Sequence, residues 1–341
     1  MSIHDIPLSI LDLAPIVTGS KPASSFRNTL DLAQHAEKWG YHRFWLAEHH
    51  NMPGIASSAT SVVIGYVAAG TEKIRVGSGG IMLPNHAPLV IAEQFGTLES
   101  MYPGRIDLGL GRAPGSDQLA ARALRRGLGS NGEDFPEQLN ELRHYFNPTD
   151  ESRAVMPKAV PGEDLNVPIW LLGSSGFSAQ LAAHHGLPFA FASHFAPDFL
   201  LPALKLYRDH FRPSDVLDKP YAMIAVNVIV ADTDEAAKFL ATSQEQAFLN
   251  LIRGRMGQLA PPVDSMDELW SEQEKMIVRK QLSFTITGTK ATVKDKLNAI
   301  VEQTEADELI VVSQVYDHAA RLRSFELLAE IVQESRDSAA Q

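Results

Sequence analysis

The sequence has no cysteine among its 341 residues. This absence excludes disulfide bonds, thiolate metal sites, iron–sulfur clusters and a cysteine nucleophile. Disulfides are rare in the cytoplasm, so a chain without cysteine fits that compartment. We therefore expect a cytoplasmic protein whose chemistry depends on other side chains.

Long apolar runs and an excess of basic charge are also missing. No stretch approaches the roughly 20 apolar residues that a membrane-spanning helix needs, and residues 1–5 lack the basic start of a signal peptide. The 30 Lys and Arg residues are outnumbered by 41 Asp and Glu residues, for a net charge of −11. Binding to nucleic-acid phosphates requires a basic surface. We therefore expect neither a membrane nor a nucleic acid as partner.

The chain has no Pro/Ser/Gly-rich linker, no repeat and no low-complexity segment. Strand-like and helix-like segments alternate along it, as in parallel α/β folds. The apolar runs predict eight strands, at residues 8–14, 43–47, 74–83, 105–110, 168–172, 189–192, 221–230 and 309–315. The helical spacing of apolar residues predicts helices at residues 25–39, 60–69, 87–102, 136–146, 175–185, 198–211, 234–253 and 319–332.

This alternation predicts an α/β fold, a (β/α)8 TIM-type barrel that forms a single domain over residues 1–341. Two irregular segments interrupt the pattern, one at about residues 114–167 after the fourth strand and one at about 254–284 before the eighth. Long irregular segments in compact folds are often functional lids. We interpret residues 254–284 as a mobile lid, with a peripheral decoration of the fold as the alternative.

Small or chemically active residues follow four of the predicted strands. These clusters are Glu48–His50, Gly77–Gly80, Gly111–Gly115 and Gly173–Ser178, after the second to fifth strands. In a barrel of this type the carboxyl ends of all strands open onto one mouth, where the chemistry takes place. We therefore expect the four clusters to converge on one pocket.

The first two clusters each have a chemical and a structural interpretation. Histidine is the usual general acid or base near neutral pH, so His49 or His50 can be catalytic. Alternatively, the two are a buried pair that is hydrogen-bonded to Glu48. The glycines at Gly77–Gly80 indicate that a flat or bulky group lies against the main chain. The alternative for these glycines is a bulge that closes the barrel.

The other two clusters predict a binding site for an anion. Arg112 at a strand end is suited to bind one, although a salt bridge at the rim is the alternative. Serines at a helix start stand beside free backbone N–H groups, where the helix dipole favours negative charge. The run from Gly173 to Ser178 therefore predicts a phosphate site, and ordinary helix capping is its alternative.

Three stretches, at residues 45–50, 76–88 and 98–112, resemble the bacterial luciferase-like flavin monooxygenase family in order and spacing. The resemblance extends from about Ile10 to the C-terminal helix and is most specific over residues 83–112. It implies a TIM-type barrel, in agreement with the count of strands. Gly111 stands where luciferase carries a reactive cysteine, so the chain resembles a non-luminescent member.

The resemblance implies a site. His49 matches the family's active-site histidine, beside the flavin ring. Gly79 and Gly80 match a pair that is joined by a cis peptide in the family and supports the bent ring of the reduced flavin. Luciferase has a carboxylate at the position of Ser174, so we expect the main chain to contribute there more than the hydroxyl. The positions that hold the FMN phosphate match Arg112, Ser174, Ser175 and Ser178.

The resemblance also implies an activity and partners. A two-component monooxygenase would take reduced FMN from a separate NAD(P)H-dependent flavin reductase. Reaction with O2 through a C4a-peroxyflavin would then oxidise a small organic, partly apolar substrate, with His49 as base or hydrogen-bond donor. The family often pairs subunits through its second and third helices, so residues 59–69 predict a homodimer.

Three alternatives remain open. The first is a hydride-transfer enzyme on the same fold that depends on the deazaflavin F420, and the second is a flavin-binding protein without catalysis. The third is a metal-dependent hydrolase with His49, His50 and His194 as ligands. His86 and Asp107 are further candidate ligands, but no common metal-ligand spacing supports any of these residues, so we expect no resident metal.

Overall fold

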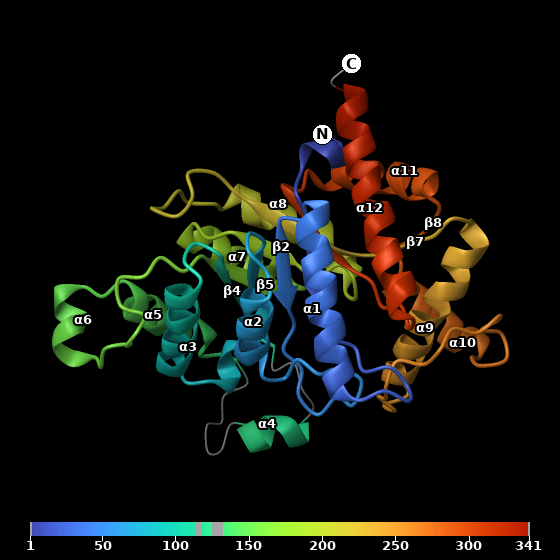
Figure 1. Cartoon of the computed structure of the whole chain (residues 1–341). Coiled ribbons are helices and arrows are strands. Elements are labelled where there is room, and N and C mark those ends of the chain that lie inside the picture. The colour runs from blue at the N-terminus through green and yellow to red at the C-terminus, as the bar shows by residue number, and fades with distance from the viewer. Residues whose placement is uncertain (1, 114–117, 125–131, 340–341) are drawn as a thin grey trace.

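The computed structural model describes residues 2–113, 118–124 and 132–339. Eight parallel strands close into a barrel that helices surround (Figure 1). The predicted (β/α)8 fold is therefore confirmed. The barrel strands are β1 (Leu8–Asp12), β2 (Arg43–Leu46), β3 (Arg75–Met82), β4 (Ile106–Gly111), β5 (Ile169–Gly173), β6 (Phe189–Phe191), β7 (Ala222–Val230) and β9 (Glu308–Val312).

The strands pair in chain order around the barrel. β1 to β6 form consecutive parallel pairs, β6 pairs with β7, and β7 pairs with β9. The ring closes where β9 pairs with β1, with Leu8 opposite Leu309. Because every pair is parallel, the carboxyl ends of the eight strands share one mouth, which points downward in Figure 1.

One strand lies outside this ring, and the predicted set of eight strands omits it. β8 (Thr285–Gly288) pairs with the C-terminal half of β7, which extends beyond its pairing with β9. The prediction of eight strands is therefore wrong by one, since the described residues form nine. β8 has only four residues and contains two threonines, so it produces no apolar run. The prediction also omits the helix that follows, α11 (Lys290–Thr304).

The helices of the barrel follow their strands and cover the outside of the sheet. α1 begins at a proline and ends at Gly40, whose φ of +81° is the left-handed conformation that glycine adopts readily. Besides α11, the outer helices are α1 (Pro22–Trp39), α2 (Thr60–Ala69), α3 (Pro88–Met101), α7 (Gly176–His185), α8 (Leu200–Asp209), α9 (Asp234–Ile252) and α12 (His318–Ala339).

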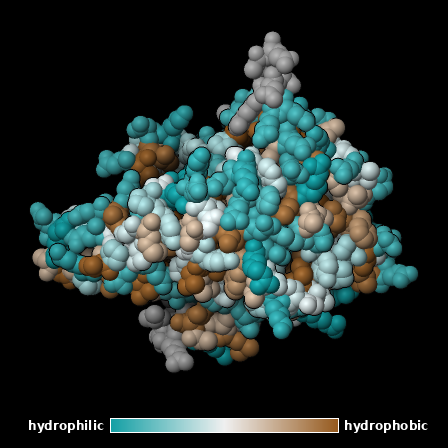
Figure 2. Space-filling view, viewed as in Figure 1, coloured by the Kyte–Doolittle hydropathy of each residue, from teal (hydrophilic) through white to brown (hydrophobic). Residues whose placement is uncertain are grey.

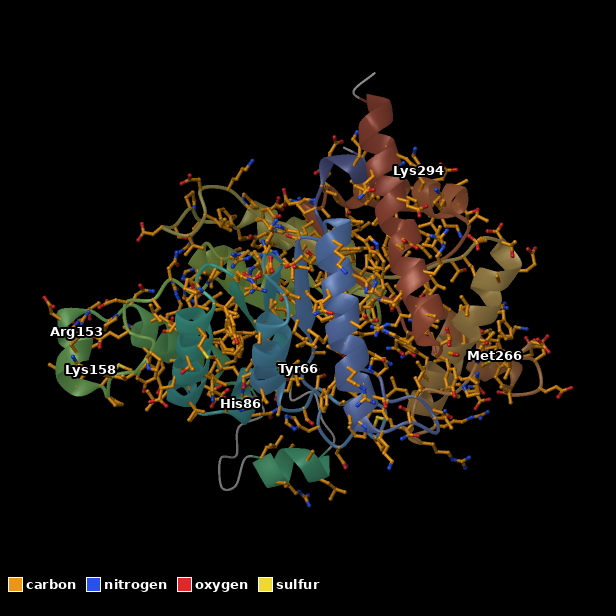
Figure 3. All side chains as sticks on the ribbon, viewed as in Figure 1. Tyr66, His86, Arg153, Lys158, Met266 and Lys294 are labelled. Carbon is orange, nitrogen blue, oxygen red and sulfur yellow. The ribbon has the colours of Figure 1, made fainter. Side chains whose placement is uncertain are left out.

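Helices also occupy the two segments predicted as insertions. After β4 lie α4 (Gln118–Leu124), α5 (Phe135–Phe146) and α6 (Asp150–Val155), and the predicted segment also includes residues 114–117 and 125–131, which lie outside the described ones. The second segment contains α10 (Glu272–Gln281). Its Met266 (labelled in Figure 3), Trp270 and Val278 form a small apolar cluster with Phe248 of α9. Residues 254–284 are therefore anchored to α9 by a small apolar core.

The barrel interior is apolar near the middle and charged at its amino-terminal end. Trp45 and Trp170 pack inside it with the other inward-facing side chains. At the strand starts, Arg43 lies 2.7 Å from a carboxylate oxygen of Asp107 and 3.1 Å from one of Glu308. This buried network is at the end of the barrel opposite the mouth, where structural roles are usual. Within the described residues, none of the helices combines the length and the apolar character that crossing a membrane requires.

Candidate active site

A cavity of about 530 Å³ opens at the mouth of the barrel. Its walls come from the loops after β1, β2, β6 and β9, from β7, and from the segment around residues 256–260 together with α9. His49 lies in this wall, three residues beyond the end of β2. The predicted catalytic residue therefore lines a mostly apolar cavity at the end of the barrel where chemistry is expected.

A second histidine, His194, lines the same cavity beside His49. His194 follows β6 and is packed edge-on against Phe195, with ring centroids 4.7 Å apart. Burial lowers the pKa of His194 to about 3, and the nearby charge of His49 contributes in the same direction. Asn227 of β7 holds this loop, because its side-chain amide donates to the main-chain oxygen of His194 at 2.5 Å. His194 therefore stays neutral in the physiological range.

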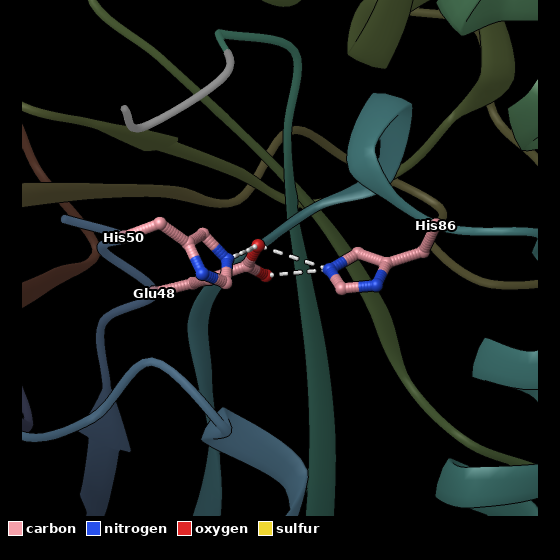
Figure 4. Close-up of side chains that lie close together, drawn as sticks. All are labelled: Glu48, His50 and His86. Atoms are coloured by element: carbon pink, nitrogen blue, oxygen red, sulfur yellow. Dashed lines mark hydrogen bonds and ion pairs between the residues drawn. The ribbon is translucent and has the colours of Figure 1, made fainter. Parts of the chain in front are cut away.

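Glu48 lies between His50 and His86 and is hydrogen-bonded to both (Figure 4). Its fully buried carboxylate accepts hydrogen bonds from His50 Nε2 at 2.8 Å and from His86 Nε2 at 2.9 Å. The main-chain N–H of Met82 and the side chain of Asn85 also donate to it, at 3.0 and 3.2 Å. Burial alone would raise the pKa of Glu48, but these hydrogen bonds lower it to about 2. One carboxylate thus joins the loop after β2 to the loop after β3.

The same three side chains, Glu48, His50 and His86, are close enough to hold a metal ion, since their ligand atoms lie within 4.8 Å of one another. Both carboxylate oxygens already accept hydrogen bonds from donors in these loops. Hydrogen bonding therefore accounts for the cluster. Of the three histidines in the hydrolase alternative, His50 belongs to this cluster, whereas His49 and His194 line the cavity.

The Gly79–Gly80 peptide is cis, and the pairing register between β3 and β4 shifts at this point. A Cβ atom on Gly79 would lie 2.7 Å from Leu11 Cδ1, and one on Gly80 would lie 2.8 Å from the main-chain oxygen of Gly109. Close packing within the barrel therefore requires both glycines. The register shift places an irregular stretch of main chain near the mouth.

Arg112 lies beside the N-terminus of α7. Gly111 pairs with Leu172, so Arg112 and the residues after Leu172 leave adjacent strands side by side. The guanidinium of Arg112 stacks on the ring of Phe177, in the first turn of α7, at 4.1 Å from the ring centre. The cation and the helix start, predicted together as an anion site, are thus in contact.

The serines of this segment differ in environment. Ser174 and Ser175 are half-buried, whereas Ser178 is buried with its hydroxyl against Gly173. Ser175 stands at the N-cap position of α7, yet its side chain makes no capping hydrogen bond. The capping alternative therefore does not describe Ser175, and the first N–H groups of the helix receive no bond from this hydroxyl.

The segment predicted as a lid is joined to the mouth by main-chain contacts. Leu259 donates to Ile16 at 2.9 Å and accepts from Thr18 at 2.8 Å. Gly54, in the loop after β2, faces Gly257 so closely that a Cβ atom on Gly54 would lie 2.3 Å from its main-chain oxygen. Residues 256–260 thus form one wall of the cavity that contains His49.

The structure brings the predicted residues to one end of the barrel in two groups. His49 lines the cavity, and Arg112 lies with Ser174, Ser175 and Ser178 at the ends of β4 and β5. The prediction omits Asn227 and the residues of α9 that face the cavity. A signal existed for Asn227, the one polar residue in the apolar run of β7.

Comparison with known proteins identifies the family. The family model for luciferase-like monooxygenases matches residues 7–308. The chain therefore belongs to the luciferase-like monooxygenase family, an assignment that confirms the resemblance and marks the protein as an oxidoreductase.

Relatives cover almost the whole chain. It is 63% identical to the uncharacterized protein YvbT of Bacillus subtilis over 327 residues, which are 96% of this chain and 97% of that protein. It is 56% identical to a luciferase-like monooxygenase of Escherichia coli, covering 98% of this chain and 99% of that one. Identity to the N-acetyl-S-alkylcysteine monooxygenase of Bacillus subtilis is 35%, covering 96% and 98%.

Solved structures share the fold. The crystal structure of apo-MsnO8 is similar with a TM-score of 0.85 at 34% identity and covers 96% of this chain and 98% of its own. The FMN complex of the oxygenating constituent of 3,6-diketocamphane monooxygenase from Pseudomonas putida has a TM-score of 0.71 at 19% identity and covers 96% of this chain and 97% of its own. An F420-dependent secondary alcohol dehydrogenase has a TM-score of 0.65 at 15% identity and covers 97% of this chain and 99% of its own. At such identities these two likenesses concern the fold alone.

Proposed function

We propose that the protein is an FMN-dependent monooxygenase that binds the cofactor phosphate at Arg112 and the start of α7. The contact between the Arg112 guanidinium and Phe177 carries the proposal, because it places a cation beside N–H groups that Ser175 does not cap. An anion at this point gains both the charge and the helix dipole. Ser174 and Ser175 border the same site, and Ser178 supports it from the buried side.

In this proposal the flavin ring lies at the mouth, against the irregular main chain at Gly79 and Gly80 and near His49. Reduced FMN, when bound, supplies two electrons to O2, so that one oxygen atom enters the substrate and the other leaves as water. His49 would hold or donate a proton at the oxygen that is transferred. Residues 254–284 would act as the lid that excludes water.

The cavity beside His49 accommodates a small organic substrate with apolar parts, since leucine, methionine and phenylalanine side chains line much of it. A separate NAD(P)H-dependent reductase would deliver the reduced flavin in the cytoplasm. We also keep the expectation that residues 1–341 form a single domain.

A homodimer is part of the proposal. Val62 and Tyr66 of α2 and Val90 and Met101 of α3 are large apolar side chains that are at least 43% exposed. Figure 2 shows apolar surface over these two helices, and Figure 3 labels Tyr66 there. Light scattering of the unmodified protein and of Val62→Asp tests it. We expect the unmodified protein to be a dimer and Val62→Asp to be a monomer. If the unmodified protein is a monomer, the proposal of a homodimer is wrong.

The cofactor is tested by anaerobic titration of the purified protein with reduced FMN and, separately, with reduced F420. Tight binding of reduced FMN alone supports the proposal. Arg112→Ala should weaken that binding, whereas Arg27→Ala, which removes an exposed arginine of α1, should not. Binding of F420 in preference to FMN would instead support the hydride-transfer alternative. Failure to bind either cofactor would contradict both.

A further inference from the structure

The cavity beside His49 has no charged side chain among its described lining residues. Twenty of the described residues line it: eleven are apolar, two are glycines, five are Asn or Gln and two are His. Charged residues make up 21% of the whole chain, so a lining of this size without one differs from the rest of the molecule. The polar groups that remain are the amides of Asn and Gln and the imidazoles of His49 and His194.

The charged residues next to the lining in sequence are directed elsewhere. Glu48, which precedes His49, is fully occupied by the histidines and amides behind the loop. Arg253 of the segment after α9 forms an ion pair with Glu274 at 2.7 Å. Arg255 is exposed and is not part of the wall. Glu48, Arg253 and Arg255 therefore do not compensate a charge inside the cavity.

His194, the second imidazole of the lining, supplies no charge. Burial of its imidazole lowers the pKa of His194 to about 3, so this side chain cannot act as a cation toward a bound acid near neutral pH. Its Nδ1 atom has no hydrogen-bond partner among the described residues, and the same holds for Oε1 of Gln281, which comes from α10 in the opposite wall. Buried polar atoms without partners mark the points where a ligand gains most from a hydrogen bond.

We propose that the substrate is an uncharged organic molecule, with an apolar body and one or two hydrogen-bonding groups that face His194 and Gln281, and that carboxylates and phosphates are excluded. An ion that enters this cavity loses its water and finds no lysine, arginine or carboxylate among the described lining residues, which is costly, whereas a neutral amide, ketone, alcohol or thioether loses little.

This inference rests on the proposed function, and it separates this chain from a relative. The N-acetyl-S-alkylcysteine named for the 35% identical Bacillus subtilis enzyme carries a free carboxylate. If that enzyme binds its substrate through this group, its cavity must contain a cation that the described lining here does not provide. The uncharged lining would therefore determine specificity between the two proteins.

The test uses a pair of ligands of equal size that differ by one charge. N-acetyl-S-butylcysteine and its carboxamide are titrated into the protein with FMN bound, and each dissociation constant is measured by calorimetry. The unmodified protein is expected to bind the carboxamide at least tenfold more tightly. Equal affinity, tighter binding of the acid, or no binding of either ligand would each overturn the assignment.

Two variants introduce a cation into the wall. Gln281→Lys should reverse or abolish the preference for the carboxamide, and Asn250→Lys, on α9, is a second variant in case the first does not fold. Met276→Lys on α10 is the matched control, because Met276 is 66% exposed and does not line the cavity. A preference that neither cavity variant changes would overturn the assignment.

The FMN titration in the same samples keeps the two proposals apart. If FMN binds and the ligand pair shows no preference for the neutral member, the substrate class is wrong while the cofactor assignment stands. If FMN does not bind, the proposed function itself fails, whatever the ligand pair does.

Discussion

Replacing Glu48 by glutamine should destabilise the mouth of the barrel strongly. The carboxylate is fully buried and accepts four kinds of donor, from His50, His86, Asn85 and the main chain of Met82. Burial would raise the pKa of Glu48, but the hydrogen bonds lower it from 4.5 to about 2. That difference corresponds to about 3 kcal/mol, since a tenfold change in proton affinity is worth about 1.4 kcal/mol.

The sign of the pH dependence follows from the lowered pKa. Because the pKa of Glu48 is lower in the folded state, its stabilisation is fully present above about pH 4.5 and is lost as the pH falls toward 2. Glutamine lacks the charge and turns an N–H donor toward other donors. We expect Glu48→Gln to lower the free energy of unfolding by about 2–4 kcal/mol at pH 6 to 7. The difference from the unmodified protein should shrink by about 1 kcal/mol at pH 3.5.

Urea unfolding at the two pH values measures both effects. Glu72→Gln is the control, because Glu72 is an exposed glutamate whose replacement should change stability by less than about 0.5 kcal/mol. A loss below about 1 kcal/mol for Glu48→Gln at neutral pH would refute the reasoning. So would a loss that stays constant down to pH 3.5, since the stabilisation would then not depend on the carboxylate charge.

Two further predictions concern the lid contact and the closed end of the barrel. Gly54→Ala should displace residues 256–260 and make them more susceptible to proteolysis, because the new Cβ atom would lie 2.3 Å from the main-chain oxygen of Gly257. Gly257→Ala is the control, because its Cβ atom would have no neighbour nearer than 4.0 Å. Equal proteolysis of the two variants would contradict the contact. Asp107→Asn should lower the free energy of unfolding in urea by about 3–5 kcal/mol, because it weakens the pairing of the buried Arg43 and the half-buried Arg75 with this carboxylate. A loss under about 1 kcal/mol would show that the network stabilises little.

The sequence predicts the barrel well because most of its strands are apolar runs that end in glycine or polar residues. β7 is the clearest example, since all nine of its residues are buried. β8 is not predictable in this way, because it is short and depends on the extension of β7 for its pairing. The helix α11 comes directly after that strand in the chain. The sequence signal for its start is the N-cap residue Thr289, whose hydroxyl accepts a hydrogen bond from the main-chain N–H of Thr292.

Some features of the candidate site can likewise be predicted from the sequence, and others depend on the fold. His49 is predictable because it closely follows a strand, and so is the proximity of Arg112 to the start of α7, since the strands before them are adjacent. The neutrality of His194 comes from its burial, which only the folded chain produces. The cavity wall at residues 256–260 likewise depends on hydrogen bonds between segments more than 200 residues apart.

The central claim is that Arg112 and the start of α7 hold the phosphate of a flavin, and comparing FMN with riboflavin tests it most directly. The two ligands share the ring and differ by the phosphate, so the ratio of their dissociation constants measures the phosphate site alone. The account predicts that the unmodified protein binds FMN at least about tenfold more tightly than riboflavin, and that Arg112→Ala removes most of this preference. Equal affinity for the two ligands, or a preference that Arg112→Ala leaves intact, would contradict the account.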